Sequence, residues 1–396
     1  MIPSGNLVNL DLTEEQQALV KALRDFAERE IRPAARECEE AGEVSDRLRD
    51  QLFEMGVAAP FSKEFGGQGA LDAVTSVLVA EELAYGDPGI AYSVLGSGLA
   101  VSLVDLAGTQ SQRRRLLPAL AEQGALPEGG RRPGAVALAE RDAGTDLSRL
   151  EAVAQPDGDS VRLFGVKYGV PAFPIAAVRL VVARYLGAVS AWLVPPDAEL
   201  SVIREDKLGL RSARTYRVCL VGVEVDGASR IGDRENGRRL ILALLRARLL
   251  DAGIALGLAR AALDYASEYA RRRLAFGRPI GVFQGVSFKI ADRAIDLEAA
   301  RLLTWKAACA VDRGHEEAER LVMSACGHAV AAGVAGAEDA VQILGGHGYM
   351  RDHPVELWYR DAMTLSTLHC PSMVGDLFLA REHERVADEG SGGDVR

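Results

Sequence analysis

The sequence predicts a mainly helical α+β protein with an N-terminal helical domain, a small central antiparallel β domain and a C-terminal four-helix bundle. Three observations predict this order. Apolar residues recur at helical spacing over residues 13–125, short β-branched runs follow a Pro/Gly/Arg-rich linker at residues 127–134, and apolar-striped helical segments resume after Asn236-Gly237. The domains are therefore expected at residues 1–134, 135–234 and 235–396.

Composition limits the class of protein. With 396 residues, of which 48% are hydrophobic and 26% charged, the chain can bury a large core. Its net charge of −10 argues against nucleic acid or an anionic membrane as a partner, because both need a basic surface. Five scattered cysteines suit a reduced cytoplasm and show no metal-ligand spacing. We expect no signal peptide and no apolar span of the roughly 20 residues that a membrane helix needs.

The N-terminal helices are marked by caps and glycines. Thr13 and Gln16 have the spacing of a capping box, so an amphipathic helix is expected to begin there. Glycine-containing loops then separate the helices expected at residues 47–55, 71–85 and 90–106.

Strands and a bundle follow. β-branched or apolar runs with turn residues between them predict strands at residues 160–165, 178–184, 190–195 and 217–225. Asp157-Gly158-Asp159 is the clearest turn. Long helices with short connections are then expected at residues 238–273, 283–313, 315–344 and 354–388, and such connections favour an antiparallel bundle.

A glycine-rich elbow follows the third of these helices. It reads Gln342-Ile-Leu-Gly-Gly-His-Gly-Tyr-Met-Arg-Asp-His-Pro354, and Leu379-Ala-Arg-Glu-His383 lies beyond it. Alone, such an elbow is more often a turn than a ligand site. The whole pattern resembles the C-terminal signature of the acyl-CoA dehydrogenases. In that family the elbow receives the adenosine-diphosphate half of FAD, held largely by a neighbouring subunit.

Two further stretches resemble that family, in family order. Residues 137–146, Ala-Leu-Ala-Glu-Arg-Asp-Ala-Gly-Thr-Asp, look like its first signature, where backbone amides and a hydroxyl approach flavin and thioester. Residues 271–284 resemble its second FAD-diphosphate element. Within them Arg273 suits a pyrophosphate because a guanidinium donates at two points, although a basic helix end is also common as a solvated terminus.

The resemblance implies FAD as cofactor and an acyl thioester as substrate, on CoA or on an acyl carrier protein. The cofactor-binding residues it implies are Arg273, Phe276, Gln284, Gln342, Gly345, Gly346, Leu138, Gly144 and Thr145. The substrate-binding residues it implies are Thr145, Arg248, Leu368 and Cys370. It also implies a homodimer or homotetramer, possibly with a paralogue.

The chain departs from the family at the catalytic base. The family's glutamate lies in a Tyr-Glu-Gly-Thr element, where this chain has Leu368-His369-Cys370-Pro371. His369 is therefore the candidate base, since an imidazole can accept a proton at neutral pH. The second base position, used by some branches of the family, is Ala247.

The chain also departs from the family around the flavin ring. Ala139 replaces a hydroxyl residue, and the family's Trp-x-Thr element aligns with Gly169 and Pro171. Proline has no N–H to donate and glycine offers no stacking face. The resemblance thus implies a retained adenosine-diphosphate end and doubtful isoalloxazine contacts.

Four functional hypotheses remain open. The first is a diverged flavoprotein oxidoreductase of the CH–CH class that acts on an acyl thioester with His369 as base. The second is a catalytically degenerate subunit of a hetero-oligomeric dehydrogenase. The third and fourth are a non-redox enzyme and an oxygen-using enzyme that reuse the same fold. Flavin absorbance of the purified protein separates the first from the third.

Overall fold

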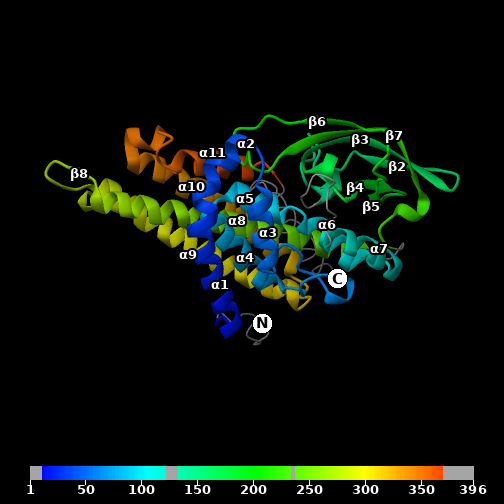
Figure 1. Cartoon of the computed structure of the whole chain (residues 1–396), viewed down its shortest axis with the longest axis horizontal. Helices are drawn as coiled ribbons and strands as arrows, with labels where there is room; N and C mark the ends of the chain where they lie inside the picture. Colours follow the sequence, from blue (N-terminus) through cyan, green and yellow to red (C-terminus); the bar gives the residue numbers. More distant parts are fainter. Residues whose placement is uncertain (1–10, 122–132, 233–236, 369–396) are drawn as a thin grey trace, which may run out of the picture.

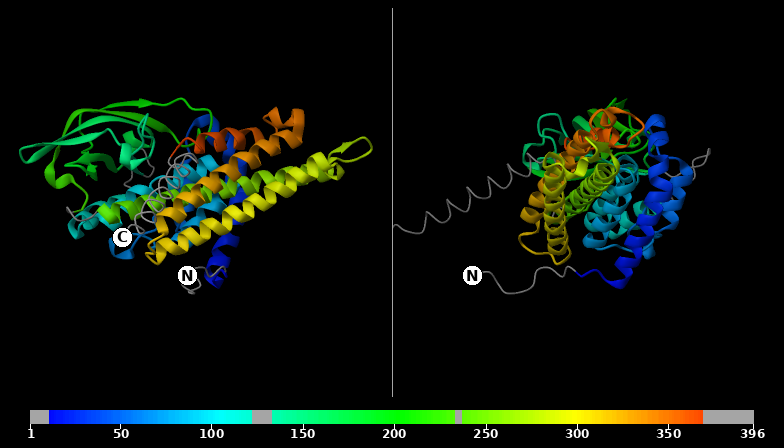
Figure 2. Two further views of the ribbon diagram at one scale, coloured as in Figure 1. Left: turned by 180° about the vertical axis from the view of Figure 1, so that it is seen from behind. Right: turned by 90° about the vertical axis from the view of Figure 1, so that its left-hand side faces the viewer.

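The structure, a computed structural model, describes residues 11–121, 133–232 and 237–368. Figure 1 shows a long helical body with the β-sheet at one end and the small hairpin labelled β8 at the other. In Figure 2 the N-terminal helices lie along the bundle helices rather than apart from them. The largest core cluster accordingly contains residues of α1, α4, α8, α9 and α10. The predicted order of helices, sheet and bundle is confirmed.

The N-terminal region consists of short and medium helices. They are α1 (Glu14–Phe26), α2 (Arg32–Ala41), α3 (Asp46–Glu54), α4 (Ala73–Gly86), α5 (Pro88–Leu95), α6 (Gly98–Ser102) and α7 (Gln110–Ala121). The predicted capping box is present: the Thr13 hydroxyl accepts the Gln16 N–H at 3.1 Å, and the Gln16 side chain accepts the Thr13 N–H at 3.0 Å. Ser45 and Asp72 cap α3 and α4 more simply, because their side chains accept the backbone N–H groups of Leu48 and Thr75.

The single helix expected at residues 90–106 is wrong, because Gly96-Ser97-Gly98 interrupts it. The chain forms α5, then α6, then a π-helical turn at Leu103–Ala107. A Cβ at Gly98 would lie 2.9 Å from Leu250 Cδ1, so the break lets this segment approach α8 closely. Ser97 Oγ also accepts the N–H of Gly134 at 3.1 Å, which ties the break to the first strand.

The central region is a seven-stranded sheet in the order β1-β4-β2-β3-β7-β6, with β5 paired to β4. Its strands are β1 (Gly134–Ala137), β2 (Val153–Asp157), β3 (Ser160–Pro171), β4 (Val178–Tyr185), β5 (Ala188–Leu193), β6 (Ser201–Arg204) and β7 (Thr215–Asp226). The β1–β4 and β2–β4 pairings are parallel and the others antiparallel, so the prediction of a mostly antiparallel sheet is confirmed. Three strands were missed because β1, β2 and β6 are short.

The C-terminal helices are α8 (Gly237–Arg272), α9 (Gln284–Asp312), α10 (Ala318–Leu344) and α11 (Val355–Leu365). The hairpin of β8 (Leu274–Ala275) and β9 (Arg278–Pro279) joins α8 to α9. The last helix, predicted over residues 354–388, ends at Leu365, and residues from 369 onward lie outside the described part of the chain.

Helices α4 and α8 pack at backbone contact. A Cβ at Gly257 would lie 2.1 Å from the Glu81 carbonyl oxygen, so a larger residue cannot fit there. The carboxylates of Glu81 and Glu82 are buried at this contact, with side chains 2% and 3% exposed. Arg260 pairs with both at 2.6 and 2.9 Å, and Arg24 pairs with Glu82 at 2.5 Å. The charges are therefore paired where the two halves of the chain meet.

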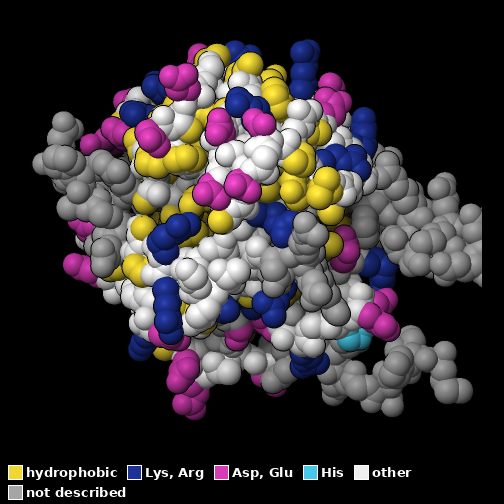
Figure 3. Space-filling view, turned by 90° about the vertical axis from the view of Figure 1, so that its right-hand side faces the viewer, with side chains coloured by type: hydrophobic (Ala, Val, Ile, Leu, Met, Phe, Trp, Pro, Cys, Tyr) yellow, Lys and Arg dark blue, Asp and Glu magenta, His cyan; other side chains and the backbone are white. Residues whose placement is uncertain are grey.

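The expectation that no apolar segment is long enough to span a membrane is wrong, since two helical segments meet the criteria of length and composition. Pro88–Ala107 and Ala318–Tyr349 are both long and apolar enough, with mean hydropathies of 1.6 and 1.3. The fold buries 56% and 61% of these windows, as in core helices. At the end that carries the sheet, Figure 3 shows acidic and basic side chains interspersed with apolar ones.

Candidate functional site

The hairpin residues predicted for FAD lie at the far end of the bundle. Phe276 stands at the hairpin tip with 94% of its surface exposed and a left-handed backbone. Arg273 is exposed at the hairpin base, where its N–H bonds the Tyr269 carbonyl at 2.8 Å. Within the described residues, Arg273 forms no ion pair. Gln284 is the first residue of α9, and the preceding Phe283 packs edge-on against Phe276 with ring centroids 6.1 Å apart.

The glycine elbow lies beside the same end of α8. Tyr269 Oη lies 2.9 Å from His347 Nδ1 in the elbow. Helix α10 ends at Leu344, and Gly345 turns the chain with φ +60°. No atom lies within 4 Å of where a Cβ at Gly345 or Gly346 would sit. Gln342 and both glycines line a cavity of about 610 Å³. The structure thus brings the hairpin and elbow residues to one end and leaves the elbow backbone open.

The residues predicted for the flavin ring and the thioester lie at the other end, where the sheet meets α8. Thr145 is fully buried, and Arg248 Nη2 donates to its carbonyl at 3.2 Å. A Cβ at Gly169 would lie 3.3 Å from Leu368, so these two residues are also neighbours. Gly144 turns the chain with φ +55° before Thr145. The candidate base His369 and the substrate candidate Cys370 lie outside the described residues.

A buried ion pair between Lys167 and Glu140 holds the loop that carries Gly144 and Thr145. Lys167 Nζ lies 2.7 Å from Glu140 Oε1 and 3.0 Å from the carbonyl of Leu138, the buried cofactor candidate. Burial lowers the pKa of Lys167, and this outweighs the pull of Glu140. Burial alone would raise the pKa of Glu140, but donation from the Glu151 N–H and from Lys167 brings that pKa below its usual value. Glu140 therefore stays ionised and fixes the loop of residues 138–145.

Strand β3 carries the two positions predicted to contact the flavin ring, Gly169 and Pro171. The Gly169 N–H already points to the Glu205 carboxylate, 3.2 Å from either oxygen. Pro171 lies close to the break between α5 and α6, since a Cβ at Gly96 would be 3.6 Å from its Cγ. The positions that would hold the family's Trp and Thr therefore supply neither a ring face nor a free N–H.

A small cavity lies next to these residues, between α5, α6 and α8. Its lining includes Ala247, the second base position, together with the buried residues Tyr92 and Asp251. Sequence reasoning missed Tyr92 and Asp251. A carboxylate within the otherwise apolar stretch Leu249–Leu258 was the signal that could have revealed Asp251, because buried acids gather at functional sites.

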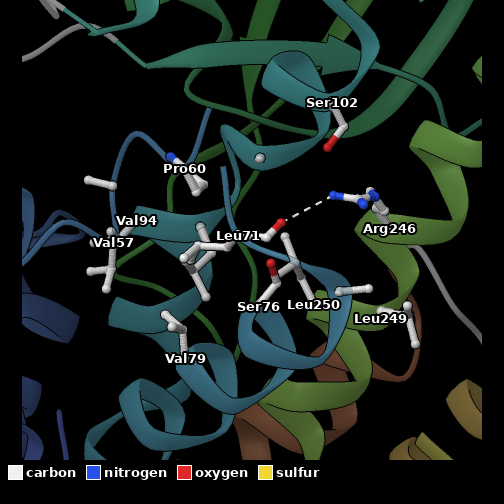
Figure 4. Close-up of a pocket in the computed structure, with 14 residues that line it drawn as sticks. Val57, Pro60, Leu71, Ser76, Val79, Val94, Ser102, Arg246, Leu249 and Leu250 are labelled. Carbon is white, nitrogen blue, oxygen red and sulfur yellow. Dashed lines mark hydrogen bonds between the residues drawn. The ribbon is translucent and has the colours of Figure 1, made fainter. Parts of the chain in front are cut away.

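A larger and mainly apolar cavity adjoins the small one (Figure 4). Leu95 and Leu250 line both cavities and so form a wall between them. Ser76, Ser102 and Arg246 bring polar groups to the larger cavity, and Arg246 Nη1 donates to the Leu71 carbonyl at 3.3 Å. Among the described residues no cluster of histidine, cysteine, aspartate or glutamate could hold a metal ion.

Comparisons with known proteins match the chain on both sides of the sheet. The family model of the acyl-CoA dehydrogenase N-terminal domain matches residues 13–124, and that of the C-terminal domain matches residues 236–374. A probable acyl-CoA dehydrogenase, YngJ of Bacillus subtilis, is 32% identical over 95% of this chain and 99% of its own length. A short-chain specific acyl-CoA dehydrogenase of Megasphaera elsdenii is 32% identical over 90% of this chain and 94% of its own.

The solved structures agree. Butyryl-CoA dehydrogenase from Megasphaera elsdenii superposes with a TM-score of 0.81 at 30% identity, covering 93% of this chain and 98% of that one. Acyl-CoA dehydrogenases are FAD-dependent flavoproteins that oxidise acyl-CoA thioesters. The family models and the relatives together cover the helical regions, the sheet and both ends of the candidate site, and this chain belongs to the acyl-CoA dehydrogenase family.

Proposed function

We propose that this chain is a diverged flavoprotein oxidoreductase that acts on an acyl thioester, carried by CoA or by a carrier protein, at an atypical active site. One observation carries the proposal: Arg248 bonds the Thr145 carbonyl beside a cavity whose wall includes Ala247. The predicted thioester residues Thr145 and Arg248 are therefore in contact, and Ala247, the neighbour of Arg248, lines a small cavity. A buried cavity with a few fixed polar groups is the usual form of a small-molecule site.

The hairpin and elbow residues, at the end of the bundle away from the sheet, fit the diphosphate of FAD. The open glycine backbone of Gly345 and Gly346 lines a cavity large enough for a nucleotide moiety, and Arg273 is exposed near it without an ion-pair partner among the described residues. Bare amides and a guanidinium are the groups that bind phosphates. When bound, FAD would supply the hydride acceptor for oxidation of the acyl α–β bond.

A second subunit is needed to complete the cofactor site. Arg248 and Arg273 are 25 positions apart on a helix and its end, which at about 1.5 Å per residue separates them by about 38 Å. An extended FAD molecule is shorter than this. One FAD molecule therefore cannot contact both Arg248 and Arg273 of the same chain. The hairpin and elbow residues of one subunit would instead bind the diphosphate of an FAD whose flavin ring lies near Thr145 and Arg248 of another subunit.

The surface of α9 supports such an assembly. Phe288, Ile295 and Leu302 recur every seven residues and are 60%, 67% and 44% exposed. Side chains at this spacing lie along one face of a helix and form an apolar stripe. Exposed apolar stripes of this kind mark interfaces between proteins. We infer a homodimer or homotetramer that is assembled through this face of the bundle. We also propose that the protein works in the cytoplasm, as its scattered cysteines suggest.

The site departs from the family at the catalytic base and at the contacts to the flavin ring. His369 is proposed as the base that removes the α-proton, in place of the family's glutamate. Gly169 and Pro171 leave the ring with fewer contacts, and this observation favours a second candidate function, a catalytically degenerate subunit that pairs with an active paralogue.

The test is the flavin content and proton chemistry of the full-length protein. A yellow protein that exchanges the α-proton of an acyl-CoA in D₂O and reduces an artificial electron acceptor would support the proposal. Exchange without reduction would indicate a base without a working flavin. A colourless protein that rejects added FAD and lacks both activities would refute the proposal, and co-purification with an active paralogue would then favour the degenerate subunit.

A further inference from the structure

Helix α7 carries a basic face beside the sheet (Figure 1). Its residues, Gln110–Ala121, include three arginines and no acidic residue. Arg114 and Arg115 are exposed, while leucines bury the opposite face of the helix. Within the residues that the structure describes, neither of these two arginines has an ion-pair partner. Exposed arginines elsewhere do have one, as Arg162 has in Asp157 at 2.6 Å.

A cavity of about 510 Å³ opens beside this face of α7. Arg115 lines it together with Arg230, which follows β7, and the Arg230 guanidinium lies 5.7 Å from the ring of Tyr185 in the same lining. Gln112 fixes this arrangement, because its side chain donates to the Arg230 carbonyl at 2.6 Å and accepts the Gly232 N–H at 2.9 Å. Among the described residues, no acidic side chain lines the cavity. It therefore offers two guanidinium groups to an anion.

The buried face of α7 connects these arginines to the residues predicted for the cofactor and the thioester. Its leucines belong to the same core cluster as Leu138 and Ala247. A helix with its side chains is about 10–12 Å across. The phosphopantetheine arm, which links an acyl group to CoA or to a carrier protein, is longer than this. An arm whose phosphate is held beside α7 is therefore long enough to bring its thioester to that core.

The exposed face of α7 favours a protein partner over a small molecule. A phosphate of CoA needs only the groups that line the cavity, and Arg114 does not line it. Arg114 instead extends the positive charge over the surface of the helix, where only a partner with a surface of its own would meet it. The whole chain has a net charge of −10, so a local basic face orients an acidic partner toward this one region. Carrier proteins are acidic, and they hold their acyl group on a phosphopantetheine arm.

We propose that Arg114, Arg115 and Arg230 form a docking surface for an acidic acyl carrier protein, whose phosphopantetheine phosphate enters the cavity. This inference rests on the proposed function and selects, from its two forms of substrate, the thioester held on a carrier protein. The opposite charges of the two surfaces orient the carrier protein before its arm enters.

The experiment measures how tightly the full-length, FAD-saturated protein binds a fluorescently labelled acyl carrier protein that bears a butyryl group. Fluorescence anisotropy gives the Kd. The double variant Arg114→Glu with Arg115→Glu should raise this Kd about tenfold, because it removes two exposed charge contacts and adds repulsion. The Kd of butyryl-CoA, from isothermal titration, should change by less than about threefold. Raising the ionic strength from about 0.1 M to about 1 M should also weaken binding of the carrier protein, since the screening length falls from about 10 Å to about 3 Å.

Two controls test whether the effect belongs to this surface. Lys21 and Arg29 are also exposed, and they lie on α1 and on the π-helical turn after it, away from the sheet (Figure 1). Changing both to glutamate alters the net charge as much as the α7 variant does, and it should leave the Kd of the carrier protein unchanged. The carrier protein without its phosphopantetheine arm has the same acidic surface, and it should bind more weakly because no phosphate enters the cavity.

Three results would overturn the docking surface. The first is a Kd of the carrier protein that stays the same in the α7 variant, folded as shown by unchanged melting. The second is an equal rise for butyryl-CoA, which would assign the arginines to a phosphate that both ligands share. The third is equal binding of the carrier protein with and without its arm, which would assign them to acidic proteins in general. Should the α7 variant not fold, binding by the unmodified protein that is absent or independent of salt would overturn the surface as well.

The proposed function is tested separately with butyryl-pantetheine, a thioester that has neither a phosphate nor a protein attached. If the protein exchanges the α-proton of this thioester in D₂O and does not bind the carrier protein, the docking surface fails and the proposed function stands. If it binds the carrier protein but neither exchanges the α-proton nor reduces an electron acceptor with any of the thioesters, the proposed function fails instead.

Discussion

Lys167→Met should destabilise the protein by about 3 kcal/mol at neutral pH, because it strands a carboxylate inside the sheet. Lys167 is fully buried and Glu140 is 5% exposed, with 2.7 Å between Nζ and Oε1. Removing one partner of a buried pair costs about 3–5 kcal/mol. Glu140 keeps the N–H groups of Glu151 and Ala152, at 2.6 and 2.9 Å, which places the loss at the lower end of that range.

The loss should shrink in mild acid. In the unmodified protein the pKa of Glu140 is lowered, so the stability that this carboxylate contributes is present above its unfolded pKa and is lost as pH falls through the folded value. Without Lys167, burial would dominate and raise the folded pKa of Glu140 above the unfolded one. Protonation then relieves the stranded charge as pH falls, and the difference between the two proteins narrows.

Urea unfolding, followed by tryptophan fluorescence, to which the buried Trp192 in the sheet contributes, measures both effects. Lys289→Met is the matched control, because Lys289 pairs with Asp339 but is 42% exposed, and it should cost less than about 1 kcal/mol. A loss for Lys167→Met below about 1 kcal/mol, or one equal at neutral pH and in mild acid, would refute this account of the ion pair.

Three further predictions follow from the site. Arg273→Ala should lower the flavin content of the purified protein while leaving the melting temperature of the cofactor-free protein unchanged; equal flavin content would make Arg273 a solvated helix end. His369→Gln should slow α-proton exchange of an acyl-CoA by about 10²–10⁴-fold, and the rate in the unmodified protein should rise with pH as the imidazole becomes neutral; unchanged exchange would remove His369 from the mechanism. Changing both Phe288 and Ile295 to aspartate should convert the assembly to monomers in light scattering and lower FAD affinity with it, and an unchanged mass would exclude this face of α9 as the interface.

The order of the regions was predictable because it depends on periodicity, which a sequence displays directly. The capping box at Thr13 and the elbow after Leu344 were predictable for the same reason, since each depends on neighbouring residues. The break at residues 96–98 was not anticipated, because its cause is the approach of α8 and of Gly134, which are distant in the sequence.

The candidate site was likewise predictable from the sequence only in part. Motif spacing identified the hairpin and elbow residues, and the structure brings them to one end of the bundle. Tyr92 and Asp251 form no motif, because they come from helices about 160 positions apart and meet only through packing. Gly169 and Pro171 were noticed only as departures from the family. Their effect on the site depends on Glu205, whose contact with Gly169 is not indicated by any sequence pattern.

The backbone contact between α4 and α8 has a consequence for biosynthesis. During translation, α4 is complete about 170 residues before Arg260 is added, so Glu81 and Glu82 wait on an apolar helix without that cationic partner. The N-terminal helices cannot reach their final packing until α8 emerges. Contacts of such large sequence separation fold slowly and leave apolar surface exposed in the meantime. A nascent chain of this protein should therefore depend on chaperones until α8, about two thirds of the way along the sequence, has emerged.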